Sequence, residues 1–549
     1  MVALPAWAGE LVTLYESGAY SQFVLTGNVN DRLFLPLPGR GDIRGLERFL
    51  LEVLLPRFDI VLSYQIGGGI RVLQGEALFS EWPEAKEGAL PIAPRPAAAF
   101  LTHFFRYAAN LGRLRGGAPQ VACLVGDAGL VIPAPSAGAD HDLGATAQLI
   151  RDWSREEALA PLPLATFLLA ENLSDLHPLL VQNPRAAQLE IPLPTAAELE
   201  VALEKLALDH PRAVGKLGAK LGKAAGQLCG ATLAAVEAAV RIKAHAGESL
   251  DRDDLATLKK DLVERDCKGL IEFVPPDRSL SDFIGHEEVV RWLKDDLSLW
   301  RRGQLDAMPM GYLLCGPVGT GKTFLAECLA GEAGIPVVKL RNFRDKWVGS
   351  TESNLERIFR LLHGLGRCVV FVDEADQSLG SREAGAGDSG LGGRVYAMIA
   401  DEMSDTRNRG RILWLLASSR PDLIEPDLKR PGRIDVKLPL LPTTSARESF
   451  DLIRALSKTR SFDISEDWFR DLAPLLPIEL TPGSAEALVG RVYRRVLTQE
   501  CDPLAGLLDA LESYRPPVSP EIIRAQVALA LREATDPMLV PAHYRSELP

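Results

Sequence analysis

The segment GPVGTGKT at 316–323 constrains the fold of this chain more than any other feature. It matches the pattern G-x-x-x-x-G-K-[ST], follows the apolar run YLLCG (312–316) and precedes the helical pattern FLAECLAGEAG. A strand, a glycine-rich turn and a helix in this order are the context in which such a loop wraps phosphate groups. We therefore predict a phosphate-binding loop in a largely parallel α/β domain.

Each residue type in this loop suits phosphate chemistry. Glycines let the backbone turn tightly, so that its N–H groups face phosphate oxygens beside a helix N-terminus. Lys322 would neutralise the β- and γ-phosphates of ATP, and the Thr323 hydroxyl would ligate Mg²⁺. The alternative, a glycine-rich turn that holds Lys-Thr by chance, does not explain the flanking strand and helix. The predicted nucleotide-binding residues of the loop are Gly316, Pro317, Val318, Gly319, Thr320, Gly321, Lys322, Thr323 and Phe324.

A second motif, CVVFVDEAD, follows at 368–376. An apolar strand that ends in two carboxylates suits an Asp373 that orients Mg²⁺ and a Glu374 that acts as the base for an attacking water. Alone, this pattern is more often a strand end in solvent. Its position after the phosphate loop favours the catalytic interpretation.

A third segment, ASSRPDLIEPDLKRPGRID, spans 417–435. The strand at 412–417 should lie beside the Asp373 strand, so Ser419 at its end could reach the γ-phosphate or the attacking water. Arg430 and Arg433 precede the next strand. They are either surface arginines in a Pro-Gly turn or an arginine finger that reaches a neighbouring subunit, which is worth on the order of 10³–10⁵ in rate where it operates.

The order of apolar and helical segments predicts two α/β modules. At roughly 150 residues per domain, 549 residues allow about three to four domains or subdomains. We predict a P-loop NTPase sheet with a C-terminal helical lid, preceded by a degenerate α/β module that has its own helical part. The predicted divisions are a degenerate module at 1–197, a helical subdomain at 198–266, a linker at 267–285, the large ATPase subdomain at 286–442, and the lid with a C-terminal helix at 443–549.

The two halves share one plan. The stretches 167–198 and 414–448 align, and Asp127 precedes Asn172 by nearly the same number of residues as Asp373 precedes Ser419. Matching order and spacing favour an internal duplication over two unrelated α/β domains.

The first half lacks the residues of the predicted site. No GK[ST] follows its strand QFVLTG (22–27), and the alignment places Asp127 opposite Asp373 and Ala128 where the base should be. Arg185 is the only arginine in QNPRAAQLE. We therefore expect the first half to bind no catalytic ATP and to serve as a structural tier, an adaptor or a substrate-recruiting domain.

Charge and composition exclude several classes of protein. Acidic residues outnumber basic ones, 73 to 61, for a net charge of −12, which argues against a dedicated nucleic-acid surface. The seven cysteines form no CxxC pair, which argues against zinc and against a disulfide framework. The first residues, MVALPAWAGELVTLYESG, have no basic start and no uninterrupted apolar stretch, so we expect them not to be a signal peptide. The sequence has no uncharged run of 18 residues, so we expect no transmembrane helix. We expect a cytoplasmic protein with no nucleic-acid or membrane partner.

From about Asp282 to 500, these motifs resemble the AAA (AAA+) ATPases, specifically the subgroup with katanin, spastin, NSF and the valosin-containing ATPases. The motifs are DFIGHEEV, GPVGTGKT, FVDEAD and SSRPDLIEPDLKRPGRID in family order. The resemblance implies that Ile284 and Gly285 contact adenine, that Gly483 marks the lid helix near the nucleotide, and that Arg430 and Arg433 act in trans. It also implies a homo-hexameric ring with ATP between subunits. Ser419 departs from the family's usual Asn, which puts the hydrolysis rate in doubt.

The segment KWVGSTESNL (346–355) resembles the family's pore loop. Trp347 and Val348 would then grip an extended polypeptide in a central channel, whereas a tryptophan taken singly is more often a core residue. The first functional hypothesis is an ATP-driven motor that remodels, unfolds or disassembles proteins. The alternative is an ATP-dependent assembly switch or scaffold with slow hydrolysis. The layout also resembles a poorly characterised AAA group of cyanobacteria and plastids with a degenerate N-terminal region.

Overall fold

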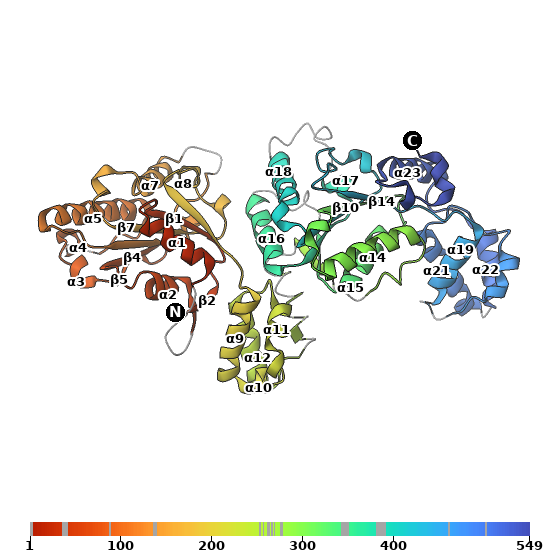
Figure 1. Ribbon diagram of the computed structural model, residues 1–549, viewed down its shortest axis with the longest axis horizontal. Coiled ribbons are helices and arrows are strands. Elements are labelled where there is room, and N and C mark those ends of the chain that lie inside the picture. Colours follow the sequence, from red (N-terminus) through yellow and green to blue (C-terminus); the bar gives the residue numbers. More distant parts are fainter. Residues whose placement is uncertain are drawn as a thin grey trace. The chain divides into compact units, whose positions relative to one another are not determined.

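The computed structural model forms two compact units, Met1–Val263 with Glu352–Leu365, and Glu264–Thr351 with Gly366–Pro549. Figure 1 follows the chain through both, and each unit is described by itself. The structure describes residues 4–548 apart from 36–41, 87–88, 136–139, 252–253, 256, 258, 261–263, 265–266, 268–269, 275–277, 342–350, 380–390, 459, 461 and 500–501.

The first unit contains a six-stranded sheet in the order β5-β4-β6-β7-β1-β8. Edge strand β5 runs antiparallel to β4, and the other neighbours are parallel. A separate antiparallel pair is formed by β2 (Arg32–Leu35) and β3 (Asp42–Gly45). The strands of the sheet are β1 Gln22–Gly27, β4 Ile60–Gln65, β5 Gly69–Gln74, β6 Val121–Val125, β7 Leu164–Leu169 and β8 Ala186–Ile191.

Helices cover both faces of this sheet. Alternate residues of β6 point to opposite sides: Val121 and Cys123 pack with the core that includes α5 and α7, and Ala122 and Leu124 pack with the core that includes α1 and α2. All five residues of β6 are buried, as expected for a central parallel strand. The helices around the sheet are α1 Ala6–Glu16, α2 Leu46–Phe49, α3 Glu76–Phe79, α4 Pro83–Lys86, α5 Pro94–Arg115, α6 Ala128–Val131, α7 His141–Asp152 and α8 Pro178–Val181, and α16 Thr351–Leu365 belongs to this unit from Glu352.

A helical part follows β8 within the first unit. Its first helix begins in a capping box, in which Thr195 and Glu198 satisfy each other's backbone N–H groups. Apolar side chains of these helices, such as Leu203, Leu228 and Val236, form a core of their own. The helices are α9 Ala196–Asp209, α10 Pro211–Val214, α11 Leu221–Leu228 and α12 Leu233–Ala246.

The second unit contains another six-stranded sheet, in the order β14-β10-β13-β12-β11-β9. Its five parallel strands follow the same relative order along the chain as those of the first sheet, so the topology agrees with an internal duplication. Edge strand β9 runs antiparallel to β11 and lies inside the segment that we expected to be a linker. The strands are β9 Ile271–Val274, β10 Gly311–Cys315, β11 Val337–Leu340, β12 Cys368–Val372, β13 Ile412–Ser418 and β14 Val436–Pro439.

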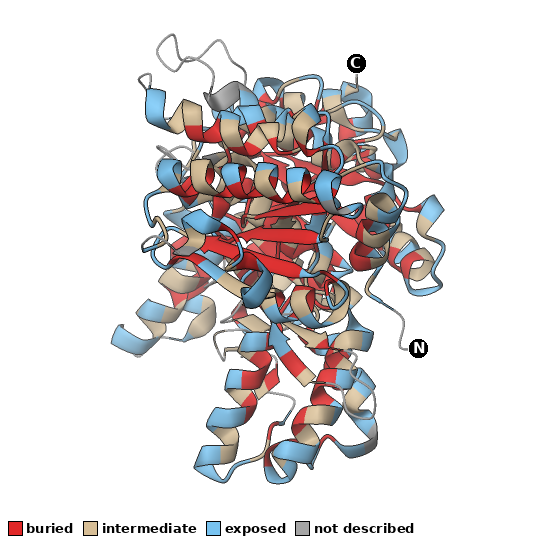
Figure 2. Ribbon diagram, turned by 90° about the vertical axis from the view of Figure 1, so that its left-hand side faces the viewer, coloured by how far each residue is buried: buried red, intermediate tan, exposed pale blue. Residues whose placement is uncertain are grey.

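The second sheet is buried like the first. Tyr312 and Leu314 of β10 pack with Leu293 and Leu329 from two covering helices. Figure 2, in which the first unit faces the viewer, shows the same arrangement for the first sheet, with buried strands between helices whose outer surfaces are exposed. The helices near this sheet are α14 Glu287–Arg301, α15 Lys322–Ala333, α17 Ala375–Ser378 and α18 Leu391–Ser404. These two α/β modules with their following helices confirm the predicted fold class.

A group of C-terminal helices follows β14. The helices between residues 446 and 512 share a core around Phe450, Leu488 and Leu507. The chain then returns to the sheet, where Thr535, just after α23, exchanges two hydrogen bonds with the backbone of Lys437. The helices are α19 Ala446–Lys458, α20 Phe469–Leu472, α21 Pro482–Gln499, α22 Pro503–Glu512 and α23 Pro520–Glu533.

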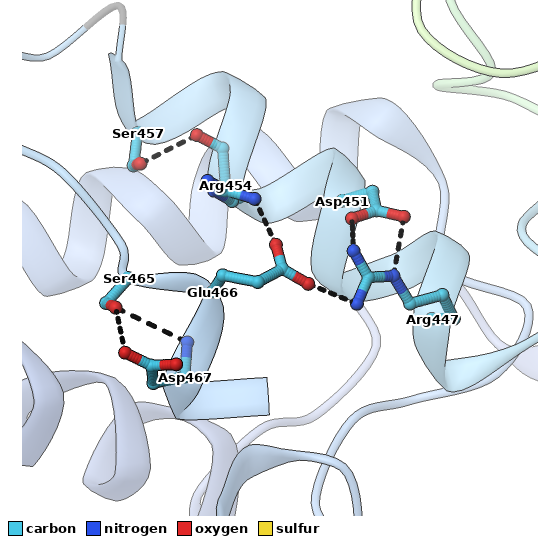
Figure 3. Close-up of polar contacts among 7 residues, drawn as sticks. All are labelled: Arg447, Asp451, Arg454, Ser457, Ser465, Glu466 and Asp467. Carbon is cyan, nitrogen blue, oxygen red and sulfur yellow. Dashed lines mark hydrogen bonds and ion pairs between the residues drawn. The ribbon is translucent and has the colours of Figure 1, made fainter. Parts of the chain in front are cut away.

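Exposed ion pairs connect α19 to the turn before α20 (Figure 3). Arg447 pairs with Asp451 one turn along α19 and with Glu466, which also pairs with Arg454. The hydrogen bond from Arg447 lowers the pKa of the Glu466 carboxyl group. Because these groups are exposed to solvent, the network orients the turn more than it stabilises the fold.

Candidate active site

The phosphate loop connects β10 to α15, as the motif predicted. A Cβ atom on Gly316 would lie 1.9 Å from the backbone oxygen of Leu440, so this close approach requires glycine. Gly321, directly before α15, has a φ of 85°, in the left-handed region that favours glycine. The loop therefore ends at the start of a helix, where backbone N–H groups are available to an anion.

Lys322 folds back over this loop. Its Nζ atom donates hydrogen bonds of 2.8 Å to the carbonyl oxygens of Gly316 and Pro317. Burial lowers the pKa of Lys322 to about 8, although the negative charge of Asp373 acts in the opposite direction. Phosphate groups placed beside this ammonium would favour its charged form. The position and electrostatics of Lys322 therefore suit a phosphate-binding lysine.

Asp373 and Thr323 meet at the carboxyl end of the sheet. The Thr323 hydroxyl donates to Asp373 Oδ2 at 3.1 Å, and the other carboxylate oxygen accepts the N–H of Glu374 at 3.1 Å. A hydroxyl and a carboxylate are hard oxygen donors of the kind that Mg²⁺ prefers. These two side chains therefore fit the predicted metal site.

Glu374 stands at the turn from β12 into α17. Its backbone has φ 48° and ψ 48°, a left-handed conformation that is uncommon for a residue other than glycine. The residue is exposed, next to the half-buried Asp373. An exposed carboxylate at this turn can contact a water molecule, which suits a general base.

Ser419 directly follows β13, which pairs in parallel with β12 as the sequence predicted. Ser419 is half-buried, while its neighbour Ser418 is buried and donates from Oγ to Asp376 Oδ1 at 2.5 Å. The structure thus places Ser419 at the same sheet edge as Asp373. Its action on the attacking water stays a prediction.

The two candidate finger arginines differ in exposure. The Arg430 side chain is 57% exposed and pairs with Asp427 at 3.3 Å, whereas that of Arg433 is 6% exposed and held by the same carboxylate. Arg433 also donates to the backbone oxygen of Asp427 at 3.1 Å. Arg430 is therefore accessible to a neighbouring subunit, and Arg433 would have to turn outward to act in trans.

The segment that is predicted to contact adenine lies against the phosphate loop. Phe283, next to Ile284, is buried, and its ring stacks near that of Phe324 with centroids 6.2 Å apart. Ile284 packs against the core of the C-terminal helices, and Gly285 has a φ of 82°. The segment is thus positioned between the sheet and those helices.

Gly483 lies in the first turn of α21 and touches the phosphate loop directly. Its N–H donates to the backbone oxygen of Gly319 at 2.9 Å. A Cβ atom on Gly483 would lie 3.3 Å from the Gly319 Cα atom. The structure therefore brings the predicted lid residue to the loop, and its contact with nucleotide stays a prediction.

The pore-loop residues Trp347 and Val348 lie outside the described residues. Their predicted contact with a polypeptide rests on the sequence resemblance.

Two residues near the site were not predicted. Lys339 of β11 pairs with Asp373, and Gln526 of α23 accepts the N–H of Val318 in the phosphate loop at 3.1 Å. Both come from segments without a motif, so only the fold reveals their proximity to the loop.

The carboxyl edge of the first sheet shows that the sequence alignment of the two halves was displaced at Asp127. Asp127 has φ 49° and ψ 45°, is exposed and precedes the one-turn helix α6, just as Glu374 precedes α17. The structural counterpart of Asp127 is therefore Glu374, and Gly126 occupies the position of Asp373. The alignment was displaced by one residue because the strands β6 and β12 contain no internal landmark. The first half keeps a carboxylate at the position of the base and has glycine at the position of the predicted metal ligand.

The turn after β1 corresponds to the phosphate loop. A Cβ atom on Gly27 would lie 2.4 Å from the backbone oxygen of Ile191, as one on Gly316 would meet Leu440. Beyond this glycine, Asp31 is buried, and its carboxylate accepts the N–H groups of Leu233 and Ala234 at 2.9 Å each. An anionic side chain of the protein itself thus binds the N-terminus of α12.

Replacement of Asp31 by Ala is expected to destabilise the start of α12 by about 2–4 kcal/mol, because two backbone N–H groups and the Asn28 amide lose a buried acceptor. Hydrogen exchange of the Leu233 and Ala234 amides measures this change. Asp31→Asn keeps one acceptor oxygen and should lose less protection. Unchanged exchange in Asp31→Ala would contradict this role.

Each half of the chain matches a known protein family. Residues 2–192 match the family model "AAA+ chaperone, N-terminal Rossmann-like domain", and residues 312–440 match "ATPase family associated with various cellular activities (AAA)". Of the helices that the structure describes, none has the length and apolar character needed to cross a bilayer.

Three curated relatives represent the similarity. The chain is 31% identical over 237 residues to the cell division cycle protein 48 homolog of Archaeoglobus fulgidus, covering 43% of this chain and 30% of the relative. It is 33% identical over 181 residues to the peroxisomal ATPase PEX6 of Dictyostelium discoideum, covering 32% of this chain and 15% of the relative. It is 32% identical over 241 residues to the ATP-dependent zinc metalloprotease FtsH of Acidothermus cellulolyticus, covering 41% of this chain and 36% of the relative.

The chain thus spans little more than a third of these relatives' length at most. The AAA family model matches residues 312–440, the range that contains the loop, Asp373 and Glu374. The chain therefore carries an AAA ATPase domain, the kind of domain that binds and hydrolyses ATP, after an N-terminal Rossmann-like domain of the AAA+ chaperone type.

Proposed function

We propose that this protein is a ring-forming, homo-hexameric ATPase that remodels, unfolds or disassembles protein substrates. The observation that carries this proposal is that the predicted site residues lie in two places. Lys322, Asp373 and Glu374 lie at one edge of the sheet, whereas Arg430 is exposed on the surface. An exposed arginine of this motif suits action on ATP bound by a neighbouring subunit. The AAA+ chaperone match of the first half supports a protein substrate.

In the proposed reaction, Thr323 and Asp373 would hold Mg²⁺, which would neutralise charge on the β- and γ-phosphates of ATP. Lys322 binds the same phosphates, and Glu374 accepts the proton of the attacking water. Ser419 orients that water, and Arg430 and Arg433 of a neighbouring subunit stabilise the transition state. Ile284, Gly285, Phe324 and Gly483 surround the nucleotide.

For the rest of the chain, we propose that Trp347 and Val348 grip the polypeptide and that the first half binds no ATP and recruits the substrate or an adaptor. The buried Asp31 at the N-terminus of α12 supports this role, since it already satisfies the N–H groups there. A nucleotide-dependent assembly switch is the second candidate, favoured by a serine at position 419, whose short side chain holds water less firmly than Asn would.

Substitution of Trp347 by Ala tests threading. ATP hydrolysis should stay within about twofold of the unsubstituted protein, while ATP-dependent binding of fluorescein-labelled casein, an unfolded polypeptide, falls at least tenfold, because the aromatic contact is lost. Trp347→Tyr is the control and should retain binding. Casein binding by Trp347→Ala that equals that of the unsubstituted protein would contradict threading and favour the switch.

A further inference from the structure

Lys339 reaches the predicted metal ligand from the neighbouring strand. β11 and β12 pair in parallel, with Lys339 opposite Phe371. The Lys339 Nζ atom lies 3.0 Å from Asp373 Oδ2 and 5.5 Å from the centroid of the Phe371 ring. The ammonium of this lysine therefore lies near both the Phe371 ring and the Asp373 carboxylate at the end of β12.

The ion pair is half-buried. The side chains of Lys339 and Asp373 are only 27% and 28% exposed. The other residues of β11 are apolar and buried, so Lys339 is the one charged residue in this strand. A long cationic side chain at the end of a buried strand is stabilised by the partner carboxylate.

The same oxygen atom serves the predicted metal site. Asp373 Oδ2 accepts both the Lys339 ammonium at 3.0 Å and the Thr323 hydroxyl at 3.1 Å. A divalent cation held by Thr323 and Asp373 would lie close to the ammonium and repel it. The lysine and Mg²⁺ would therefore compete for one carboxylate oxygen.

We propose that Lys339 is a positioning residue of the ATPase site: it holds Asp373 when Mg²⁺ is absent and is displaced when Mg²⁺ enters with the nucleotide. This inference rests on the proposed Mg²⁺ site. Lys339 then sets the Mg²⁺ concentration that nucleotide binding requires. The cation keeps the carboxylate in place before the metal arrives and raises the Mg²⁺ concentration that binding requires.

The test is a Mg²⁺ titration of the binding of a fluorescent ADP analogue to the full chain. In Lys339→Met, the Mg²⁺ concentration for half-maximal binding should fall about fivefold, the size expected for loss of one half-buried ion pair. Lys339→Arg keeps a cation and should restore the higher Mg²⁺ requirement. Because ADP is not hydrolysed, this readout is independent of activity.

Arg341→Met is the matched control. Arg341 follows the same strand, and its guanidinium pairs with Glu272 at 3.4 Å. Its replacement removes a positive charge close by but leaves the Asp373 pair in place, so the Mg²⁺ requirement should not change. If Lys339→Met unfolds, Lys339→Gln, which keeps a polar group, replaces it in the titration.

The outcomes separate this proposal from the one on which it rests. An unchanged Mg²⁺ requirement in Lys339→Met, or an equal shift in Arg341→Met, would overturn the role of Lys339 and leave the metal site intact. Nucleotide binding by the unsubstituted protein that is indifferent to Mg²⁺ would overturn the metal site and this inference together.

Discussion

Lys322→Ala is expected to weaken ATP binding by at least about 100-fold, or about 3 kcal/mol, and to abolish hydrolysis. The ammonium is the charged group of the phosphate loop, and its Nζ atom is held 2.8 Å from two loop carbonyl oxygens. Its removal leaves the phosphates without their cation in a partly buried site. Isothermal titration with ATP and Mg²⁺ measures the loss.

Lys437→Ala is the matched control for this experiment. Lys437 lies in the same unit, but its Nζ atom pairs with Glu533 at 2.8 Å instead of bonding the loop. Its replacement should leave ATP affinity within about twofold, the range expected for a charge outside the site. ATP affinity in Lys322→Ala equal to that of the Lys437→Ala control would show that the loop does not bind phosphate.

Glu374→Gln is expected to slow hydrolysis by about 10²–10⁴-fold while ATP binding persists. The substitution keeps the size of the side chain and removes the basic carboxylate. The backbone N–H of residue 374 still supports Asp373 Oδ1, so the predicted metal ligand keeps its partner. Phosphate release in single-turnover conditions measures the chemical step, and titration of the same variant measures affinity.

Asp376→Asn provides the comparison for this second variant. Asp376 lies two residues beyond Glu374 and binds the Ser418 hydroxyl, so its substitution perturbs the same turn without removing the base. A smaller rate loss in Asp376→Asn than in Glu374→Gln is expected. Hydrolysis by Glu374→Gln at the unsubstituted rate would exclude Glu374 as the base.

Much of the fold was predictable because its strands are short apolar runs. β10, β12 and β13 are buried along their whole length, and covered parallel strands of this kind are readily recognised in a sequence. The sequence did not indicate β9 inside the predicted linker, because β9 pairs only at the sheet edge and precedes a Pro-Pro pair. Nothing local distinguishes such an edge strand from an extended connection.

Site residues were predictable where the local backbone geometry requires a particular residue type. Gly316 must be glycine because of a close backbone approach, and such a requirement leaves a signature in the sequence. Lys339 and Gln526 have no such signature, since each reaches the loop region from a separate element. The predicted counterpart of Asp127 was one position off because only its backbone dihedral angles identify it with Glu374.

The solution mass of Glu374→Gln, measured with and without ATP and Mg²⁺, tests the proposed ring most directly. This variant is expected to keep ATP bound, so an assembly that depends on nucleotide between subunits would persist long enough to be measured. We predict a species near six times the mass of one chain when ATP and Mg²⁺ are present. A monomer or dimer with ATP bound would contradict the ring and the action of Arg430 in trans.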